Sequence, residues 1–172
     1  MRSIKNETNL RDKKILLRLD LNVPIVKGKI SDTTRIDKIL PTLKFLNKQK
    51  AKIIILSHVG RPRGKVLKEL SLKPISENLQ EQLGLSVKLI SQNIYEIKNK
   101  NFFDNFNEKI LMLENIRFYA EEEKNDNKFA KHLASLGDLY VNDAFSCSHR
   151  SHASIVKISK FLPSFSGLQI DL

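Results

Sequence analysis

The sequence predicts an α/β fold, a Rossmann-like three-layer sandwich with a mostly parallel sheet. Short apolar runs alternate along the chain with segments whose apolar residues recur every three or four positions, as in right-handed β-α-β units. Four apolar runs lead directly into loops rich in Arg, His, Asp or Asn; they cover residues 15–24, 53–62, 110–118 and 139–152. Because ligands bind at the carboxyl ends of strands in such a sheet, these loops predict one binding site at one edge.

Length and composition favour a single soluble domain. The chain has 172 residues, of which 41% are hydrophobic and 28% charged, so it can bury a core. No apolar run approaches the roughly 20 residues of a membrane span, and the N-terminal segment lacks the apolar stretch of a secretory signal. Cys147 is the only cysteine, which excludes disulfides and multi-cysteine zinc sites. We therefore expect a cytoplasmic protein without a membrane partner.

The first strand is predicted over residues 14–21, and a turn over residues 27–29 follows it. Asp32 or Thr33 can cap the next helix. Its inward apolar positions are Ile36, Ile39, Leu40, Leu43 and Leu46. Pro41 lies inside this pattern, so we expect a kink or a one-turn break there.

The second strand, over residues 52–56, is an unbroken apolar run of the kind buried on both faces of a parallel sheet. Ser71 begins the following helix, and Gly84 is its expected C-cap. The inward residues of this helix are Ile75, Leu79 and Leu83. A short strand is then expected over residues 87–90.

In the second half of the chain, residues 94–106 predict helical turns joined by polar loop, and residues 110–113 a buried strand. Asp126 can cap a helix whose apolar side carries Phe129, Leu133 and Leu136. A strand over residues 139–141 and a short helix over residues 154–161 complete the expected elements.

The net charge of +11 is carried unevenly by two residue types. The lysines are scattered over predicted helix faces and loop tips, whereas the eight arginines are concentrated. Arg61, Arg63, Arg117 and Arg150 lie in the strand-end loops, and Arg35 opens a helix. A nucleic-acid-binding module is the alternative, but it requires aromatic side chains interleaved with the basic ones. Only three aromatic residues lie near the basic loops: Phe118, Tyr119 and Phe145.

The loop after the second strand could be mistaken for a nucleotide-binding P-loop. That motif needs four residues between its glycines and a Ser or Thr after its lysine, whereas three residues separate Gly60 from Gly64 and Val66 follows the lysine. A P-loop is therefore excluded, and no G-x-G-x-x-G occurs. His58 and Arg61 are instead interpreted as side-chain donors, since a guanidinium fork suits phosphate or carboxylate. The alternative is a surface turn with incidental charge.

Other polar residues allow two interpretations each. Asp20 and Asn22 could bond a substrate hydroxyl or simply cap a turn. Arg117 could bind a ligand or pair with Glu114 or with the acidic run at 121–123.

The remaining histidines and the cysteine give little evidence of a functional role. His149 and His152 have spacing that metal sites use, but only Asp143 lies near them and no second carboxylate accompanies it, so we expect no metal site. His132 is predicted to lie on an exposed helix face without a role, and Cys147 to be small and partly buried.

Five sequence motifs together resemble those of a known protein family. They are RLDLNVP at 18–24, SDTTRI at 31–36, SHVGRP at 57–62, LMLENIRF at 111–118 and YVNDAFSCSHRSHAS at 140–154. In this order and spacing the sequence resembles the N-terminal domain of the phosphoglycerate kinase family, with Leu19 and Leu21 where the family has valine and phenylalanine. The resemblance implies that 1–172 is the substrate-binding domain and that 163–172 begins the interdomain segment. The family's nucleotide domain would begin shortly after Gly167, so we expect these 172 residues not to include it.

The resemblance also implies roles for individual residues. His58, Arg61, Arg117 and Arg150 would form the basic patch around the phosphate of 3-phosphoglycerate. Arg35, the one residue expected to be catalytic, would contact the carboxylate and stabilise the phosphoryl group during transfer. The full set of implied substrate-binding residues is Asp20, Leu21, Asn22, Arg35, His58, Val59, Gly60, Arg61, Arg117 and Arg150.

The implied reaction is reversible phosphoryl transfer between 1,3-bisphosphoglycerate and ADP in glycolysis, giving 3-phosphoglycerate and ATP. Mg-ATP and Mg-ADP would be bound by the absent domain, with no cofactor or metal on this chain. The expected molecule is a monomer without a nucleic-acid partner, and this chain alone should show no kinase turnover. A phosphosugar-binding remnant without catalysis is a further alternative.

Overall fold

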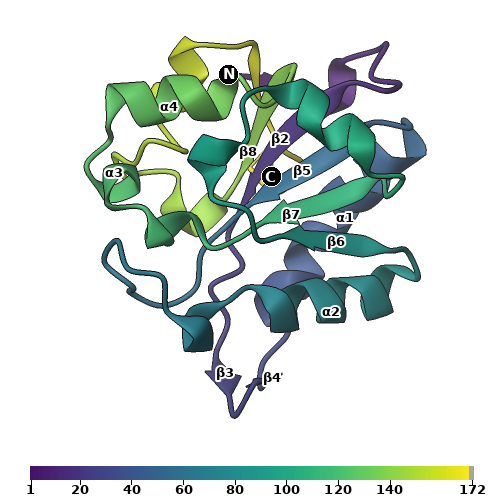
Figure 1. The fold of residues 1–172 in the computed structure, drawn as a ribbon. Helices are drawn as coiled ribbons and strands as arrows, with labels where there is room; N and C mark the ends of the chain where they lie inside the picture. Colours follow the sequence, from purple (N-terminus) through teal and green to yellow (C-terminus); the bar gives the residue numbers. More distant parts are fainter. Residues whose placement is uncertain (171–172) are drawn as a thin grey trace.

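The computed structural model describes residues 1–170, and its middle layer is a seven-stranded, fully parallel sheet (Figure 1). The strands, in spatial order, are β1 (Arg2–Ser3), β9 (Ser164–Ser166), β8 (Leu139–Asp143), β2 (Lys14–Leu19), β5 (Lys52–Leu56), β7 (Ile110–Leu113) and β6 (Val87–Ile90). A separate antiparallel hairpin pairs β3 (Ile25–Val26) with β4 (Lys29–Ile30) around the predicted turn. The predicted α/β fold class is confirmed.

Helices cover both faces of the sheet (Figure 1). The α-helices are α1 (Thr34–Lys48), α2 (Lys73–Leu83), α3 (Ala120–Glu123) and α4 (Asn127–Ala134). Ile15 and Leu17 of β2 belong to the core on the α1 and α2 side, whereas Leu16 belongs to the core under α4. Since successive side chains point to opposite faces, both faces of β2 are buried. No helix among residues 1–170 has the length and apolar composition needed to cross a bilayer.

Short 3-10 helices fill several connections. They span Ile4–Asn6, Lys68–Leu70, Ile94–Glu96, Lys100–Asn105, Ile116–Phe118, Phe145–Cys147 and Lys157–Lys160. The helical turns predicted over residues 94–106 correspond to two of these.

The expected break at Pro41 is wrong, because α1 runs continuously through it. Pro41 is exposed, and Asp37, whose carbonyl loses its helical partner to the proline, is exposed too, so water can satisfy that carbonyl. At the start of α1, the Thr33 side chain makes no capping bond; the Asp32 carboxylate instead accepts the backbone N–H of Thr34 at 2.9 Å.

The start of α2 and the helix predicted over residues 154–161 also differ from the prediction. α2 starts at Lys73 rather than at Ser71, whose hydroxyl donates to Glu114. Gly84 is the C-cap, as predicted, with φ +65°. The helix predicted over residues 154–161 is reduced to the 3-10 turn Lys157–Lys160. The residues before this turn form hydrogen-bonded turns instead: Val156 N donates to the carbonyl of His152 at 2.8 Å and Ile158 N to that of Ala153 at 2.9 Å.

His132 is half-buried rather than exposed. Its Nε2 lies 2.7 Å from the carbonyl oxygen of Ile94, and its ring stacks on Tyr95 at 5.7 Å between centroids. It therefore ties α4 to the neighbouring 3-10 turn.

The order β8-β2-β5-β7 places the four polar loops side by side, as predicted. The register aligns the strand ends: Arg18 of β2 lies opposite Leu56 of β5 on one side and Asn142 of β8 on the other. The loops that follow these strands therefore leave the sheet at one edge.

Candidate functional site

A cavity of about 510 Å³ opens at this edge. Its lining residues are Asn22, Arg35, His58, Gly60, Arg61, Arg63, Arg117, Glu123, Ser146, Cys147 and Arg150. Five of them are arginines and one is acidic. Such a concentration of guanidinium groups attracts an anion and can bind phosphate or carboxylate oxygens in pairs.

The loop between β5 and α2 is held by backbone contacts to both neighbouring loops. The N–H of Gly60 donates to the amide oxygen of Asn22 at 2.9 Å, and the N–H of Gly64 donates to the carbonyl of Arg117 at 3.1 Å. At Gly64, with φ +79°, a Cβ would lie 2.8 Å from the Cβ of Ala120. Glycine is thus required there for both conformation and space. The two arginines between these glycines are presented to the cavity.

Asn115 organises the loop that carries Arg117. Its amide nitrogen donates to the carbonyls of Val59 and Leu70 at 2.9 and 3.0 Å, and its amide oxygen accepts the N–H of Arg117. Within the described residues, the buried Nε of Arg117 has no hydrogen-bond partner. Burial lowers the pKa of this guanidinium, which still keeps its charge at neutral pH. Arg117, which lines the cavity, therefore keeps one donor unsatisfied within the described residues.

Asp20 and Arg35 form an ion pair beside the cavity. Both carboxylate oxygens of Asp20 accept from the same guanidinium nitrogen of Arg35, at 2.9 and 3.0 Å. The Asp20 carboxylate also accepts the N–H of Asn22 and the hydroxyl of Ser146. Asp20 is buried, whereas 46% of the Arg35 side chain stays exposed. The pair therefore orients Arg35 without hiding it from a ligand.

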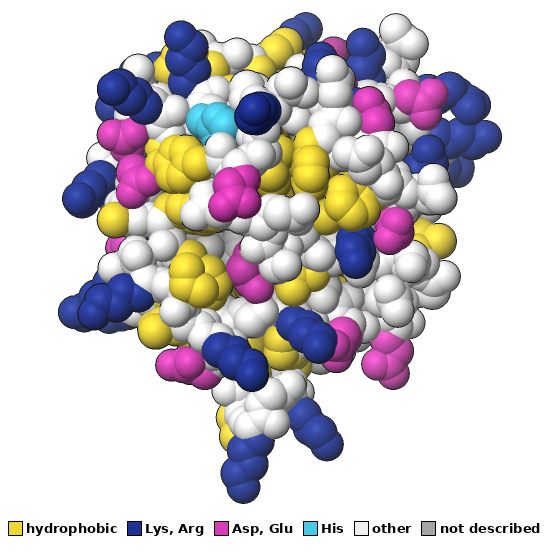
Figure 2. Space-filling view, viewed as in Figure 1, with side chains coloured by type: hydrophobic (Ala, Val, Ile, Leu, Met, Phe, Trp, Pro, Cys, Tyr) yellow, Lys and Arg dark blue, Asp and Glu magenta, His cyan; other side chains and the backbone are white. Residues whose placement is uncertain are grey.

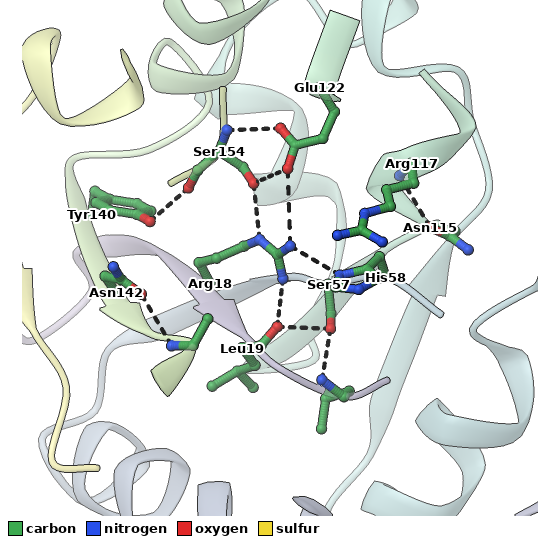
Figure 3. A network of polar contacts seen from close by, with 12 residues as sticks. Arg18, Leu19, Ser57, His58, Asn115, Arg117, Glu122, Tyr140, Asn142 and Ser154 are labelled. Atoms are coloured by element: carbon green, nitrogen blue, oxygen red, sulfur yellow. Dashed lines mark hydrogen bonds and ion pairs between the residues drawn. The ribbon is translucent and has the colours of Figure 1, made fainter. Parts of the chain in front are cut away.

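A further arginine, Arg18, which the sequence interpretation passed over, is fully buried. Figure 3 shows its contacts with neighbouring polar groups. Arg18, on β2, donates from Nε to the hydroxyl of Ser154 at 2.8 Å and from Nη1 to the carbonyl of Leu19 at 2.5 Å. Its Nη2 lies 3.9 Å from the carboxylate of Glu122. The signal in the sequence is a single basic residue inside the otherwise apolar run ILLRL.

His58 joins this buried network to the cavity. Its Nδ1 lies 3.0 Å from Nη2 of Arg18, and Figure 3 shows the Arg117 guanidinium near the ring. Burial, followed by the charges of Arg18 and Arg117, lowers the pKa of His58 to about 2. His58 is therefore neutral, and it contributes a hydrogen bond rather than a positive charge to the basic patch.

The structure separates the predicted site residues into two groups. Those that line the cavity are Asn22, Arg35, His58, Gly60, Arg61, Arg117 and Arg150. Asp20 lies directly beside it through Arg35. Leu21 and Val59 instead belong to the hydrophobic core, and the Val59 carbonyl is occupied by Asn115. Both side chains are 2% exposed or less, so any contact of these two residues with a substrate would be made by backbone groups, and their assignment stays a prediction.

Four lining residues were not among the predicted set: Arg63, Glu123, Ser146 and Cys147. Arg63 shares the loop of Arg61, which was the available signal. Burial raises the pKa of the Cys147 thiol, which is consequently protonated at neutral pH. His149 is exposed, whereas His152 is buried. No group of three or more His, Cys, Asp or Glu side chains within residues 1–170 is placed to hold a metal ion.

A parallel α/β domain with an arginine-lined cavity at its carboxyl edge is suited to bind small phosphorylated or carboxylated molecules. Comparison with known families makes this specific. The family model described as phosphoglycerate kinase matches residues 5–171. The chain belongs to the phosphoglycerate kinase family.

Individual relatives agree with this assignment. A phosphoglycerate kinase of Borrelia garinii subsp. bavariensis is 44% identical over 99% of this chain and 44% of its own length. One from Wolbachia pipientis subsp. Culex pipiens is 50% identical over 92% of this chain and 40% of its own length. The solved phosphoglycerate kinase of Coxiella burnetii superposes with a TM-score of 0.88 at 36% identity, covering 98% of this chain and 42% of that one. The chain thus spans less than half the length of these relatives.

Proposed function

We propose that this chain is the 3-phosphoglycerate-binding half of a phosphoglycerate kinase, which reversibly transfers a phosphoryl group between 1,3-bisphosphoglycerate and ADP in glycolysis. The observation that carries the proposal is the cavity with five arginines at the carboxyl edge of the sheet. Family membership supports the same reading, since the matched model describes phosphoglycerate kinases.

The residues divide the work as follows. Arg61, Arg117 and Arg150 bind the phosphate of 3-phosphoglycerate, and His58 donates a further hydrogen bond. Asn22, whose amide oxygen is already held by Gly60, is left with its amide nitrogen to bond the C2 hydroxyl. Asp20 bonds the same region chiefly through Arg35, because its own oxygens are occupied.

Arg35 is the catalytic residue of the proposal. In the forward direction the bond between the acyl oxygen and the phosphorus breaks, and a bond from a terminal oxygen of ADP to that phosphorus forms. Negative charge is spread over the oxygens of the phosphoryl group during transfer, so a well-oriented cation lowers the barrier. Arg35 is oriented by Asp20 and half-exposed, which suits it to this role. No side-chain nucleophile is needed, since the substrate supplies the activated acyl phosphate.

The nucleotide co-substrate, Mg-ATP or Mg-ADP, is proposed to bind to the part of the family's length that this chain does not span. We further propose a monomer that acts in the cytoplasm without a nucleic-acid partner. On the face drawn in Figure 2, basic side chains are interspersed with acidic and apolar ones and form no continuous stripe, which supports the last point.

Calorimetric titration of the chain with 3-phosphoglycerate, and separately with Mg-ATP, tests the proposal. We expect weak, saturable binding of 3-phosphoglycerate that weakens with added salt, because exposed guanidinium charges are screened. Mg-ATP should bind negligibly, and a coupled assay should detect no turnover. Glycerate is the matched control, since it lacks only the phosphate. Equal binding of glycerate and 3-phosphoglycerate, or tighter binding of Mg-ATP, would overturn the assignment.

A further inference from the structure

Arg18 cannot contact a ligand in the cavity. Its side chain has no exposed surface, it is absent from the cavity lining, and all three guanidinium nitrogens are engaged inside the protein. A buried cation is costly unless it is paired and hydrogen-bonded, and Arg18 is both, so any role in the site must act through the groups that it contacts.

The contact between Arg18 and His58 has a chemical consequence. A guanidinium has donors only, so the Nδ1 of His58, 3.0 Å from Nη2 of Arg18, must present its lone pair. The proton of the neutral ring is therefore on Nε2. Among the described residues Nε2 has no hydrogen-bond partner, and His58 lines the cavity. The ring thus offers one N–H to whatever the cavity holds.

Ser154 and Glu122 hold Arg18 in the position that this contact requires. The Ser154 hydroxyl gives its only proton to the Glu122 carboxylate, which leaves its lone pairs to accept from Nε of Arg18. The other Glu122 oxygen accepts the N–H of Ser154 at 2.7 Å, and the Tyr140 hydroxyl donates to the Ser154 carbonyl at 2.6 Å. The guanidinium is consequently fixed from two sides (Figure 3).

We propose that Arg18, held by Glu122 and Ser154, is a positioning residue that fixes His58 as the Nε2–H tautomer and so makes it a neutral hydrogen-bond donor to the bound anion. The tautomer follows from the buried network alone; only the identity of the anion, 3-phosphoglycerate, rests on the proposed function. The groups around the ring agree with a neutral donor, since Arg18, Arg117, His152 and Arg150 all disfavour a second proton.

Nitrogen-15 NMR of the histidine rings in the full chain tests the tautomer directly. We expect His58 to show an unprotonated Nδ1 and a protonated Nε2, unchanged between about pH 5.5 and 8, whether or not a ligand is present. A His58 ring that carries its proton on Nδ1, or that titrates in this range, overturns the proposal independently of any binding result.

Two pairs of variants test the positioning. In Ser154→Ala and Glu122→Gln, the His58 signals should shift toward a mixture of tautomers, whereas Glu121→Gln, on the same helix but bonded to Tyr95 outside the cavity, should leave them unchanged. Ser154→Ala decides the matter if Glu122→Gln does not fold. Unchanged His58 signals in the folded variants would show that Arg18 does not need this support.

The second pair replaces the ring itself. The amide nitrogen of His58→Gln can lie near the position of Nε2, whereas that of His58→Asn lies near Nδ1. We expect His58→Gln to bind 3-phosphoglycerate within about threefold of wild type and His58→Asn to lose about tenfold or more, the effect of one charge-assisted hydrogen bond. Equal losses in the two variants would remove the Nε2–H donor from the site. If wild type itself binds no 3-phosphoglycerate, the proposed function fails while the NMR result stands.

Discussion

Arginine has two different roles in this molecule, and the contrast lies in burial. Arg61, Arg63 and Arg150 are exposed on the cavity rim, where water solvates them until an anion displaces it. Arg18 lies a few residues from the same edge but is fully buried and paired with Glu122. The rim arginines can therefore be lost at little cost to the fold, whereas Arg18 is part of the folded structure itself.

The largest expected effect is at the buried arginine. Arg18→Met leaves the Glu122 carboxylate buried without its cation and removes three hydrogen bonds. We expect the free energy of unfolding to fall by roughly 3–5 kcal/mol, measured by urea denaturation. Arg61→Ala is the matched control and should change stability by less than about 0.5 kcal/mol. Similar losses at both positions would erase the distinction between buried and rim arginines.

The neutral state of His58 predicts how stability depends on pH. The pKa of His58 is about 2 in the folded protein and 6.5 in the unfolded chain. Below pH 6.5 the unfolded state therefore binds a proton that the folded state does not bind. Stability is therefore lost as pH falls from 6.5, by about 1.4 kcal/mol per pH unit from this group, or about 2–3 kcal/mol by pH 4.5.

Urea denaturation at a series of pH values measures that slope. His58→Gln should show a shallower loss of stability than wild type between pH 6.5 and 4.5, because the titrating group is gone. His149→Gln, at an exposed histidine, should retain the wild-type slope. A slope unaffected by His58→Gln would mean that another group causes the loss.

Rim arginines should affect binding instead of stability. Arg61→Ala or Arg150→Ala should each weaken 3-phosphoglycerate binding by roughly 1.5–3 kcal/mol, since each removes a hydrogen bond from a charged donor. Calorimetry checks this, with Arg11→Ala as an exposed arginine outside the cavity lining. Unchanged affinity in both rim variants would take these residues out of the site.

The smallest effect on binding is expected at Arg35. Arg35→Lys loses the guanidinium fork but keeps the positive charge, so 3-phosphoglycerate affinity should change by less than about threefold. In an enzyme of full family length the same change should lower kcat far more than it raises KM, as expected of an interaction made mainly in the transition state. A normal kcat would make Arg35 a helix-opening residue paired with Asp20 and nothing more.

Local patterns were enough to predict most of the fold. The apolar run at Lys52–Leu56 and the capped, periodic segment after Asp126 depend on neighbours in sequence, and both appear as predicted. The same holds for the loops at the carboxyl ends, because strand direction alone brings them to one edge. Residues that line the cavity, such as Arg61 and Arg150, were predictable for this reason.

What local patterns could not decide depends on contacts distant in sequence. Residues 154–161 do not form the predicted helix, and the N–H of Ser154 bonds to Glu122, 32 residues earlier. The same carboxylate pairs with Arg18, 104 positions before it (122 − 18), and so determines that one arginine is buried. The sequence by itself determined which residue types reach the edge of the sheet. Only the tertiary structure decided which of them stay charged in water and which are buried, because solvation and pairing depend on the groups that folding brings together.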